Sequence, residues 1–110
     1  MPNIKLFVDH QLLAARHAEI SAQLAPLREL ACHLLSVPAS ACQLAVIGVI
    51  GLKDQPLANM EFQYLATAER TPERIGEVCA AFRSFLAASL GITPAIRSTP
   101  LDPTTYVAMK

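Results

Sequence analysis

The second residue of the chain, Pro2, is the candidate with the most distinctive chemistry. It directly follows the initiator Met1, and a small residue at this place is usually permissive for removal of the methionine. Removal would leave Pro2 with a secondary amine. An α-amine titrates near neutrality, and enclosure in an apolar pocket lowers its pKa further. Such a group suits general-base catalysis. The alternative is that Pro2 merely begins a β-strand, where its missing N–H costs nothing.

The composition limits the classes of function that the chain can serve. Its 110 residues carry a formal net charge of zero, 53% of them are hydrophobic and 16% are charged. This length allows one domain with a real core. A neutral chain with few aromatic residues argues against nucleic acid as a partner. The apolar balance indicates that some surface is buried between subunits, so we expect an oligomer.

Other sequence signals point to a cofactor-free protein that is cytoplasmic. No stretch resembles a membrane span or a secretory signal, so we expect no membrane partner. Cys32, Cys42 and Cys79 each lie among apolar residues, which predicts reduced, buried thiols. The histidines share no ligand spacing, and no Gly-rich phosphate loop is present. We therefore expect no metal site and no cofactor.

Hydrophobic periodicity predicts an α+β fold of alternating strands and helices. The predicted strands are 3–9, 42–50, 59–66 and 92–98, with a short terminal strand at 106–109, and the predicted helices are 20–35 and 71–90. Pro26 either kinks the first helix or lies in the first turn of a new one. Thr71 is the predicted N-cap of the second helix, and Gly91 its stop. Residues 10–17 form a connection without a firm assignment.

The order of these elements gives two βαβ halves, about 1–51 and 57–110, that we interpret as pseudo-repeats within a single domain over 1–110. The Leu34–Ala39 and Leu90–Ala95 segments echo each other at the second joint of each half. Two such units side by side predict a four-stranded sheet with both helices on one face. We expect the uncovered face to be apolar and to account for the oligomer.

With these elements in place, the chain resembles the tautomerase superfamily, including its 4-oxalocrotonate tautomerase and macrophage migration inhibitory factor branches. Met1-Pro2 opening into the first strand, the two βαβ halves and the length carry this resemblance over the whole chain. The segment from Glu61 to Tyr106 also looks like a little-characterised bacterial subgroup of that fold. The resemblance implies a homotrimer with a pocket at the subunit boundary. It also implies proton transfer on an enol or 2-oxo acid, with Pro2 as the base.

The resemblance further implies cations that hold the substrate's carboxylate or enolate. The start of the second strand reads Gln43-Leu44-Ala45 and departs from the family pattern, because no cation occupies it. Arg97 on the late strand is the first candidate, and Lys53 on the central loop is the second. Lys5 has the opposite strand parity to Pro2, so we expect it to point away from the pocket.

Hydroxyl groups are the remaining candidates for contact with a substrate. Tyr64 and Tyr106 could each donate a hydrogen bond to an oxyanion, although half-buried packing is the commoner fate of a strand tyrosine. Two functions of different classes stay open. One is a tautomerase or isomerase acting on a small carboxylate or carbonyl substrate. The other is a non-catalytic trimeric binding or scaffold protein that retains the fold, which the missing second-strand cation favours.

Overall fold

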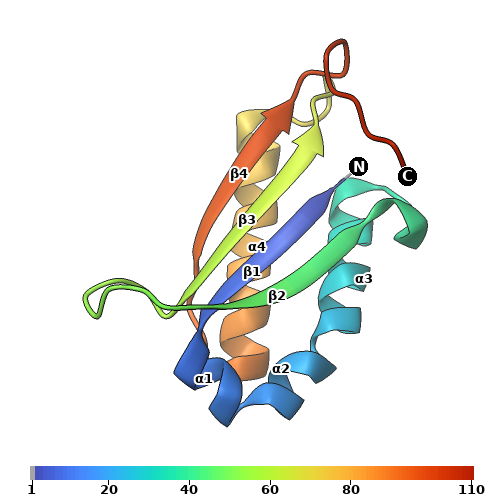
Figure 1. Cartoon of the computed structure of the whole chain (residues 1–110). Helices are drawn as coiled ribbons and strands as arrows, with labels where there is room; N and C mark the ends of the chain where they lie inside the picture. The colour runs from blue at the N-terminus through green and yellow to red at the C-terminus, as the bar shows by residue number, and fades with distance from the viewer. Residues whose placement is uncertain (1) are drawn as a thin grey trace.

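A single mixed sheet forms one layer of the molecule, and the long helices pack against one of its faces (Figure 1). The computed structural model describes residues 2–110, so the prediction about Met1 falls outside the described residues. The four strands follow the order β2-β1-β3-β4. They are β1 Asn3–Asp9, β2 Gln43–Val49, β3 Ala58–Leu65 and β4 Ala95–Leu101. The predicted four-stranded α+β architecture is confirmed.

The pairing directions are those of two βαβ units placed side by side. β1 pairs with β2 in parallel, and β3 pairs with β4 in parallel. The central strands β1 and β3 are antiparallel, which places the free edges of the sheet on β2 and β4. Each parallel pair is joined by a helical crossover, as parallel strands require.

The first crossover is built from short helices, and the second from one long helix. Between β1 and β2 lie α1 His10–Ala15, α2 His17–Ala22, α3 Leu24–Leu35 and the 3-10 turn η1 Ala39–Ala41. Pro26 lies in the first turn of α3, where its missing N–H has no partner to lose, so a new helix begins here. Between β3 and β4 lies α4 Pro72–Leu90. Within residues 2–110, no helix has both the length and the apolar character that crossing a bilayer requires.

Capping residues lie at both ends of α4, as the sequence predicted. The Thr71 side-chain oxygen accepts a hydrogen bond of 3.2 Å from the Arg74 backbone N–H, and Pro72 occupies the first turn. Gly91 ends the helix with φ of 66°, the left-handed conformation that glycine adopts without strain. Ser36 ends α3 in the same conformation, with φ of 54°, although it carries a side chain.

The last strand differs from its prediction. β4 begins at Ala95 and runs through Pro100 to Leu101, whereas the sequence placed it at 92–98. An edge strand tolerates proline because the N–H on its outer side needs no partner. The predicted strand at 106–109 is wrong, because these residues form no strand in the structure.

The core lies between the helices and the inward-facing side chains of β1 and β3. Its largest buried members include Ile4, Val8, Met60, Phe62, Leu27, Val78, Phe82 and Leu86. The Phe62 and Phe82 rings meet edge to face, with centroids 5.4 Å apart, a favoured aromatic geometry. The two central strands and both long helices therefore share one core.

The open face of the sheet is mixed, which corrects the expectation of an apolar face: polar side chains lie on all four strands, and Phe7, Ala45, Ile47 and Val49 form an apolar part on β1 and β2. The alternation that buries Ile4 and Leu6 turns the intervening residues outward. The polar side chains on this face are Asn3, Lys5, Gln43, Asn59, Glu61, Gln63, Arg97 and Thr99. The most exposed large apolar residues instead lie in the β2–β3 loop and the carboxyl-terminal tail, at Ile50, Leu52, Leu57, Val107 and Met109.

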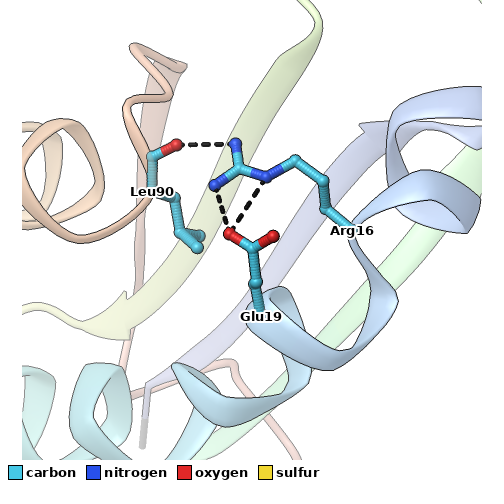
Figure 2. Close-up of polar contacts among 3 residues, drawn as sticks. All are labelled: Arg16, Glu19 and Leu90. Atoms are coloured by element: carbon cyan, nitrogen blue, oxygen red, sulfur yellow. Dashed lines mark hydrogen bonds and ion pairs between the residues drawn. The ribbon is translucent and has the colours of Figure 1, made fainter.

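Arginines of each βαβ unit cap the last carbonyls of the other unit's helix. Arg16, between α1 and α2, donates a 2.7 Å hydrogen bond to the Leu90 carbonyl at the end of α4 (Figure 2). Glu19 orients the same guanidinium through bonds of 2.7 and 3.2 Å. In the opposite direction, Arg70 and Arg74 donate to the Leu35 and Leu34 carbonyls at the end of α3, at 2.8 and 2.9 Å. These bonds satisfy carbonyls that a helix end leaves unpaired.

Candidate functional site

Pro2 is buried immediately ahead of β1, at the end of the sheet where the chain's two ends meet (Figure 1). Its carbonyl accepts a 3.1 Å hydrogen bond from the Gln43 N–H and so begins the β1–β2 ladder. A cavity of about 360 Å³ lies beside it. The cavity is lined by Pro2, Asn3, Ala41, Gln43, Tyr106, Ala108, Met109 and Lys110. The sheet therefore fixes Pro2 against a space that can hold a small molecule.

The carboxyl-terminal tail forms the second wall of this cavity. After β4 the chain turns at Asp102, whose carboxylate accepts bonds of 2.9 and 2.7 Å from the Thr104 N–H and hydroxyl. These bonds hold the pKa of Asp102 below its ordinary value. The Tyr106 N–H then donates to the Asp102 carbonyl at 2.9 Å, which returns the tail towards Pro2. Tyr106, at 36% exposure, is thus one of the residues that line the Pro2 cavity.

The other predicted site residues lie away from this cavity within the chain. Arg97 projects from the open face of β4, where its Nη1 donates a 2.6 Å hydrogen bond to Asn59 Oδ1. Lys53 lies in the β2–β3 loop, which extends from the far end of the sheet (Figure 1). Tyr64 is 6% exposed and packs in the core, with its ring centroid 5.8 Å from that of Phe62. Of the predicted substrate-binding residues, only Tyr106 meets Pro2 among the described residues.

A second, larger groove adjoins the cavity along the free edge of β2. It measures about 680 Å³ and is lined by Asn3, Lys5, Leu24, Ala25, Arg28, Cys42, Gln43, Leu44 and Ala45. Asn3 and Gln43 line both spaces, so the groove begins where the Pro2 cavity ends. Arg28 was not among the predicted site residues, because the family pattern led us to expect a cation on the second strand itself. The available signal was helical spacing: Arg28 follows Leu24 by one turn on the side of α3 that lies beside β2.

Cys42 and Cys79 are poorly suited to act as nucleophiles. Burial, and to a smaller extent the neighbouring Cys32 thiol, raise the pKa of Cys42 to about 11, while Arg28 acts in the opposite direction. Burial likewise raises the pKa of Cys79. A thiol with a raised pKa stays protonated at neutral pH and is inert. Within residues 2–110, no group of three or more His, Cys, Asp and Glu side chains is placed to hold a metal ion.

Comparison with known proteins identifies the fold, although the sequence has no close match. No protein-family model matches the chain, and no curated protein matches its sequence significantly. A macrophage migration inhibitory factor-like protein from Entamoeba histolytica aligns with a TM-score of 0.70 at 9% identity, over 98% of this chain and 95% of that one. A fused 4-OT, described as an asymmetric trimer, aligns with a TM-score of 0.67 at 15% identity, over 96% and 91%.

A third solved structure extends the likeness to a protein without a described activity. It is a domain of unknown function from Sebaldella termitidis, with a TM-score of 0.70 at 15% identity, over 98% of this chain and 95% of that one. The chain therefore has a tautomerase-like fold, as the sequence resemblance implied. At these identities the likeness establishes the fold and leaves the chemistry to the site.

Proposed function

We propose that this protein is a small tautomerase or isomerase that moves a proton on an enol or 2-oxo acid, with Pro2 as the general base after removal of Met1. One observation carries the proposal: Pro2 is buried yet lines a cavity of about 360 Å³ that also contains a tyrosine and two amide side chains. The tautomerase-like fold supports it, since the related structures include a fused 4-OT.

The chemistry follows from the groups around the cavity. The neutral amine of Pro2 takes a proton from the substrate, and negative charge gathers on the oxygen of the resulting enolate. The Tyr106 hydroxyl and the amide N–H groups of Asn3 and Gln43 are the donors that can stabilise this oxygen. The protonated amine then returns the proton to another atom of the substrate. No cofactor takes part in these proposed steps.

The burial of Pro2 favours the neutral amine that such a base requires. A free α-amine has a pKa of roughly 7.7–8.0 in water, and desolvation disfavours its charged form. The value of kcat/KM should therefore rise with pH through the pKa of the Pro2 amine and level off above it.

We further propose that the protein is a cytoplasmic homotrimer, in which neighbouring subunits supply cations to the Pro2 cavity. Arg97 and Lys53 remain candidates for holding the substrate's carboxylate, from a second subunit. Arg97 is exposed on an edge strand, and the β2–β3 loop that bears Lys53 extends beyond the sheet. The role of Tyr64 in substrate binding stays a prediction from the sequence.

Two preparations of the same sequence test the role of the amine. One has Pro2 at its terminus, and the other retains Met1 because methionine aminopeptidase was inhibited during expression; intact mass verifies each. Phenylenolpyruvate tautomerisation should be about 10²–10⁴-fold faster with the free amine, the usual contribution of a general base. Equal rates in the two preparations would remove Pro2 from the mechanism.

A non-catalytic trimeric binding or scaffold protein is the second candidate function. The observation that favours it is the absence of both predicted cations, Arg97 and Lys53, from the Pro2 cavity within the described chain. Under this alternative, protein with a free Pro2 binds small carbonyl acids saturably but turns none of them over. Equilibrium binding and turnover measured on one preparation separate the two functions.

A further inference from the structure

Two of the three cysteines lie where α3 packs against the start of β2 (Figure 1). Cys32 follows Arg28 by one turn of α3, and Arg28 lines the larger groove together with Leu24 and Ala25. Cys32 therefore belongs to the stripe of α3 that faces β2. Cys42 comes directly before β2 and lines the same groove. The two side chains thus approach each other from adjacent elements.

Backbone hydrogen bonds hold both ends of the connection between these cysteines. The Val37 N–H donates to the Cys32 carbonyl at 3.1 Å, which closes the end of α3 behind the left-handed Ser36. The Cys42 N–H donates to the Ala39 carbonyl at 3.2 Å, within the 3-10 turn η1. Ordered structure therefore positions both cysteines.

The two thiols are in contact in the reduced protein. Burial is the main cause of the raised pKa of Cys42, and the interaction with the Cys32 thiol adds to it. Cys42 is 4% exposed, whereas Cys32 is half-buried. Cys79 differs from both, because it lies on α4 and its side chain is hydrogen-bonded to Ser98. The chain thus contains one pair of neighbouring thiols and one thiol whose partner is a serine.

We propose that Cys32 and Cys42 form a redox site, at which a hydroperoxide converts the two thiols into one intramolecular disulfide. The Cys32 thiolate attacks an oxygen of the peroxide, the O–O bond breaks, and hydroxide leaves, so that Cys32 becomes a sulfenic acid. The Cys42 sulfur then forms the S–S bond, and the sulfenic oxygen leaves as water with the Cys42 proton. The hydroxide takes up the proton that Cys32 lost. The two thiols lose two electrons and two protons, and one peroxide becomes two waters.

The roles of the two sulfurs follow from their surroundings. Cys32 is the more exposed thiol, so the peroxide reaches it first. The raised pKa of Cys42 makes it a poor nucleophile towards an external reagent, but its contact with Cys32 supplies a high effective concentration for the second step. A disulfide formed in this way in a reducing compartment is transient and typical of redox sensing.

The redox site adjoins the Pro2 cavity without belonging to it. Ala41 and Gln43, on either side of Cys42 in the chain, line that cavity, whereas Cys42 lines the larger groove. Neither thiol takes part in the proposed proton transfer. The inference is therefore independent of the proposed function, and it stands whether or not Pro2 is a base.

Peptide mapping after oxidation tests the disulfide directly. Reduced protein is treated with hydrogen peroxide, alkylated under denaturing conditions and cleaved with trypsin. Residues 29–53 form one tryptic peptide that contains both Cys32 and Cys42, while residues 75–83 contain Cys79. We expect the 29–53 peptide to lose two hydrogen atoms and to escape alkylation until dithiothreitol is added, while Cys79 stays alkylated. An alkylated 29–53 peptide, or disulfides only between separate chains, would overturn the proposal.

Variants identify which sulfur meets the oxidant. In Cys42→Ala the sulfenic acid at Cys32 has no partner, so dimedone should trap it. In Cys32→Ser, trapping at Cys42 should be about 10-fold lower, because a buried thiol with a raised pKa reacts poorly. Cys79→Ser is the matched control and should form the 29–53 disulfide as the parent does. Equal trapping at Cys32 and Cys42 would overturn the assignment of the first step.

Thermal unfolding of the parent protein gives a readout that needs no variant. The oxidised form should melt about 5 °C or more above the reduced form, because the crosslink restricts the unfolded chain, and dithiothreitol should reverse the shift. A lower melting temperature after oxidation would show that the folded protein cannot accommodate the bond, and would overturn the redox site.

Discussion

The two βαβ units of this protein connect their parallel strands in different ways. Both join a pair of parallel strands with helices on the same face of the sheet. In the β3–α4–β4 unit the connection is one helix of 19 residues, with a side-chain N-cap and a glycine stop. In the β1–β2 unit it is broken into α1, α2 and α3, of which α2 and α3 have no side-chain N-cap.

The unit with the clearer helix-capping signals differs from the unit that carries most of the candidate site residues. Pro2, Lys5 and Arg28 all belong to the β1–β2 unit, as do the walls of the larger groove. The β3–β4 unit contributes the regular helix and the aromatic pair of the core. In this broken crossover, the side of α3 that bears Arg28 lies beside the edge of β2. We infer that the second unit supplies much of the stability, and that the first unit holds the site together with the tail that follows β4.

The largest expected effect tests the share of the core that each unit supplies. Phe82→Ala in α4 removes a fully buried ring that contacts Phe62, and should lower the free energy of unfolding by about 3–5 kcal/mol. Leu27→Ala in α3 removes a smaller side chain, and should cost about 2–3 kcal/mol. Urea denaturation at one fixed protein concentration measures both. A larger loss for Leu27→Ala would reverse the comparison.

The next effect concerns the arginine caps that join the units. Arg70 donates to the Leu65 and Leu35 carbonyls, at 2.7 and 2.8 Å, and so ties β3 to the end of α3. Arg70→Gln should cost about 2 kcal/mol, in the range of hydrogen bonds to a charged group. Arg83→Gln, on an exposed arginine, should change stability by less than about 0.5 kcal/mol. Equal costs for the two variants would show that the cap contributes nothing.

The two helix stops offer a smaller, matched test. Gly91→Ala should cost about 1 kcal/mol, because φ of 66° strains any side chain, while the added Cβ meets no atom within 4 Å. Ser36→Gly should instead stabilise the protein by about 0.5 kcal/mol, since glycine relieves the same strain in α3 but gains freedom in the unfolded chain. Thermal unfolding of both variants checks the signs. Loss of stability in Ser36→Gly would show that the serine side chain has a role at this stop.

The smallest expected effect is a change in acid sensitivity. Hydrogen bonds and charge from Arg16 hold the pKa of the Glu19 carboxyl below its ordinary value of 4.5. A carboxyl with a lowered pKa stabilises the folded state above its unfolded pKa, and this contribution disappears as pH falls through the folded pKa. Glu19→Gln should therefore slightly flatten the acid limb of a stability–pH curve. An unchanged acid limb would show that the pair is fully screened by solvent.

The sequence predicted the architecture where hydrophobic periodicity and capping signals agree. Thr71, Pro72 and Gly91 marked α4 correctly, because capping chemistry is local. β4 was misplaced since an edge strand tolerates Pro100, which otherwise reads as a breaker. The division into pseudo-repeats within a single domain stays a prediction.

The site was less accessible from the sequence, because it depends on which elements come together. Pro2 and Tyr106 lie at opposite ends of the chain. They line one cavity because the turn at Asp102 returns the tail towards Pro2, which the sequence did not predict. Arg28 lies beside the edge of β2 because α3 packs there. The hydrophobic pattern of each separate element does not predict this packing. The open face was expected to be apolar from overall composition, but it is mixed, and the most exposed apolar residues lie in a loop and the tail.

The first hydrogen bond of the β1–β2 ladder has a consequence for the timing of activity. It uses the carbonyl of Pro2, as acceptor from the Gln43 N–H at 3.1 Å. A proline nitrogen within the chain has no hydrogen to donate, so the Pro2 nitrogen itself contributes no ladder hydrogen bond before processing. The same strand register can then serve before and after processing. Under the proposed function, folding and chemical maturation are independent events, and methionine aminopeptidase is the enzyme that converts a folded but inactive protein into a catalyst.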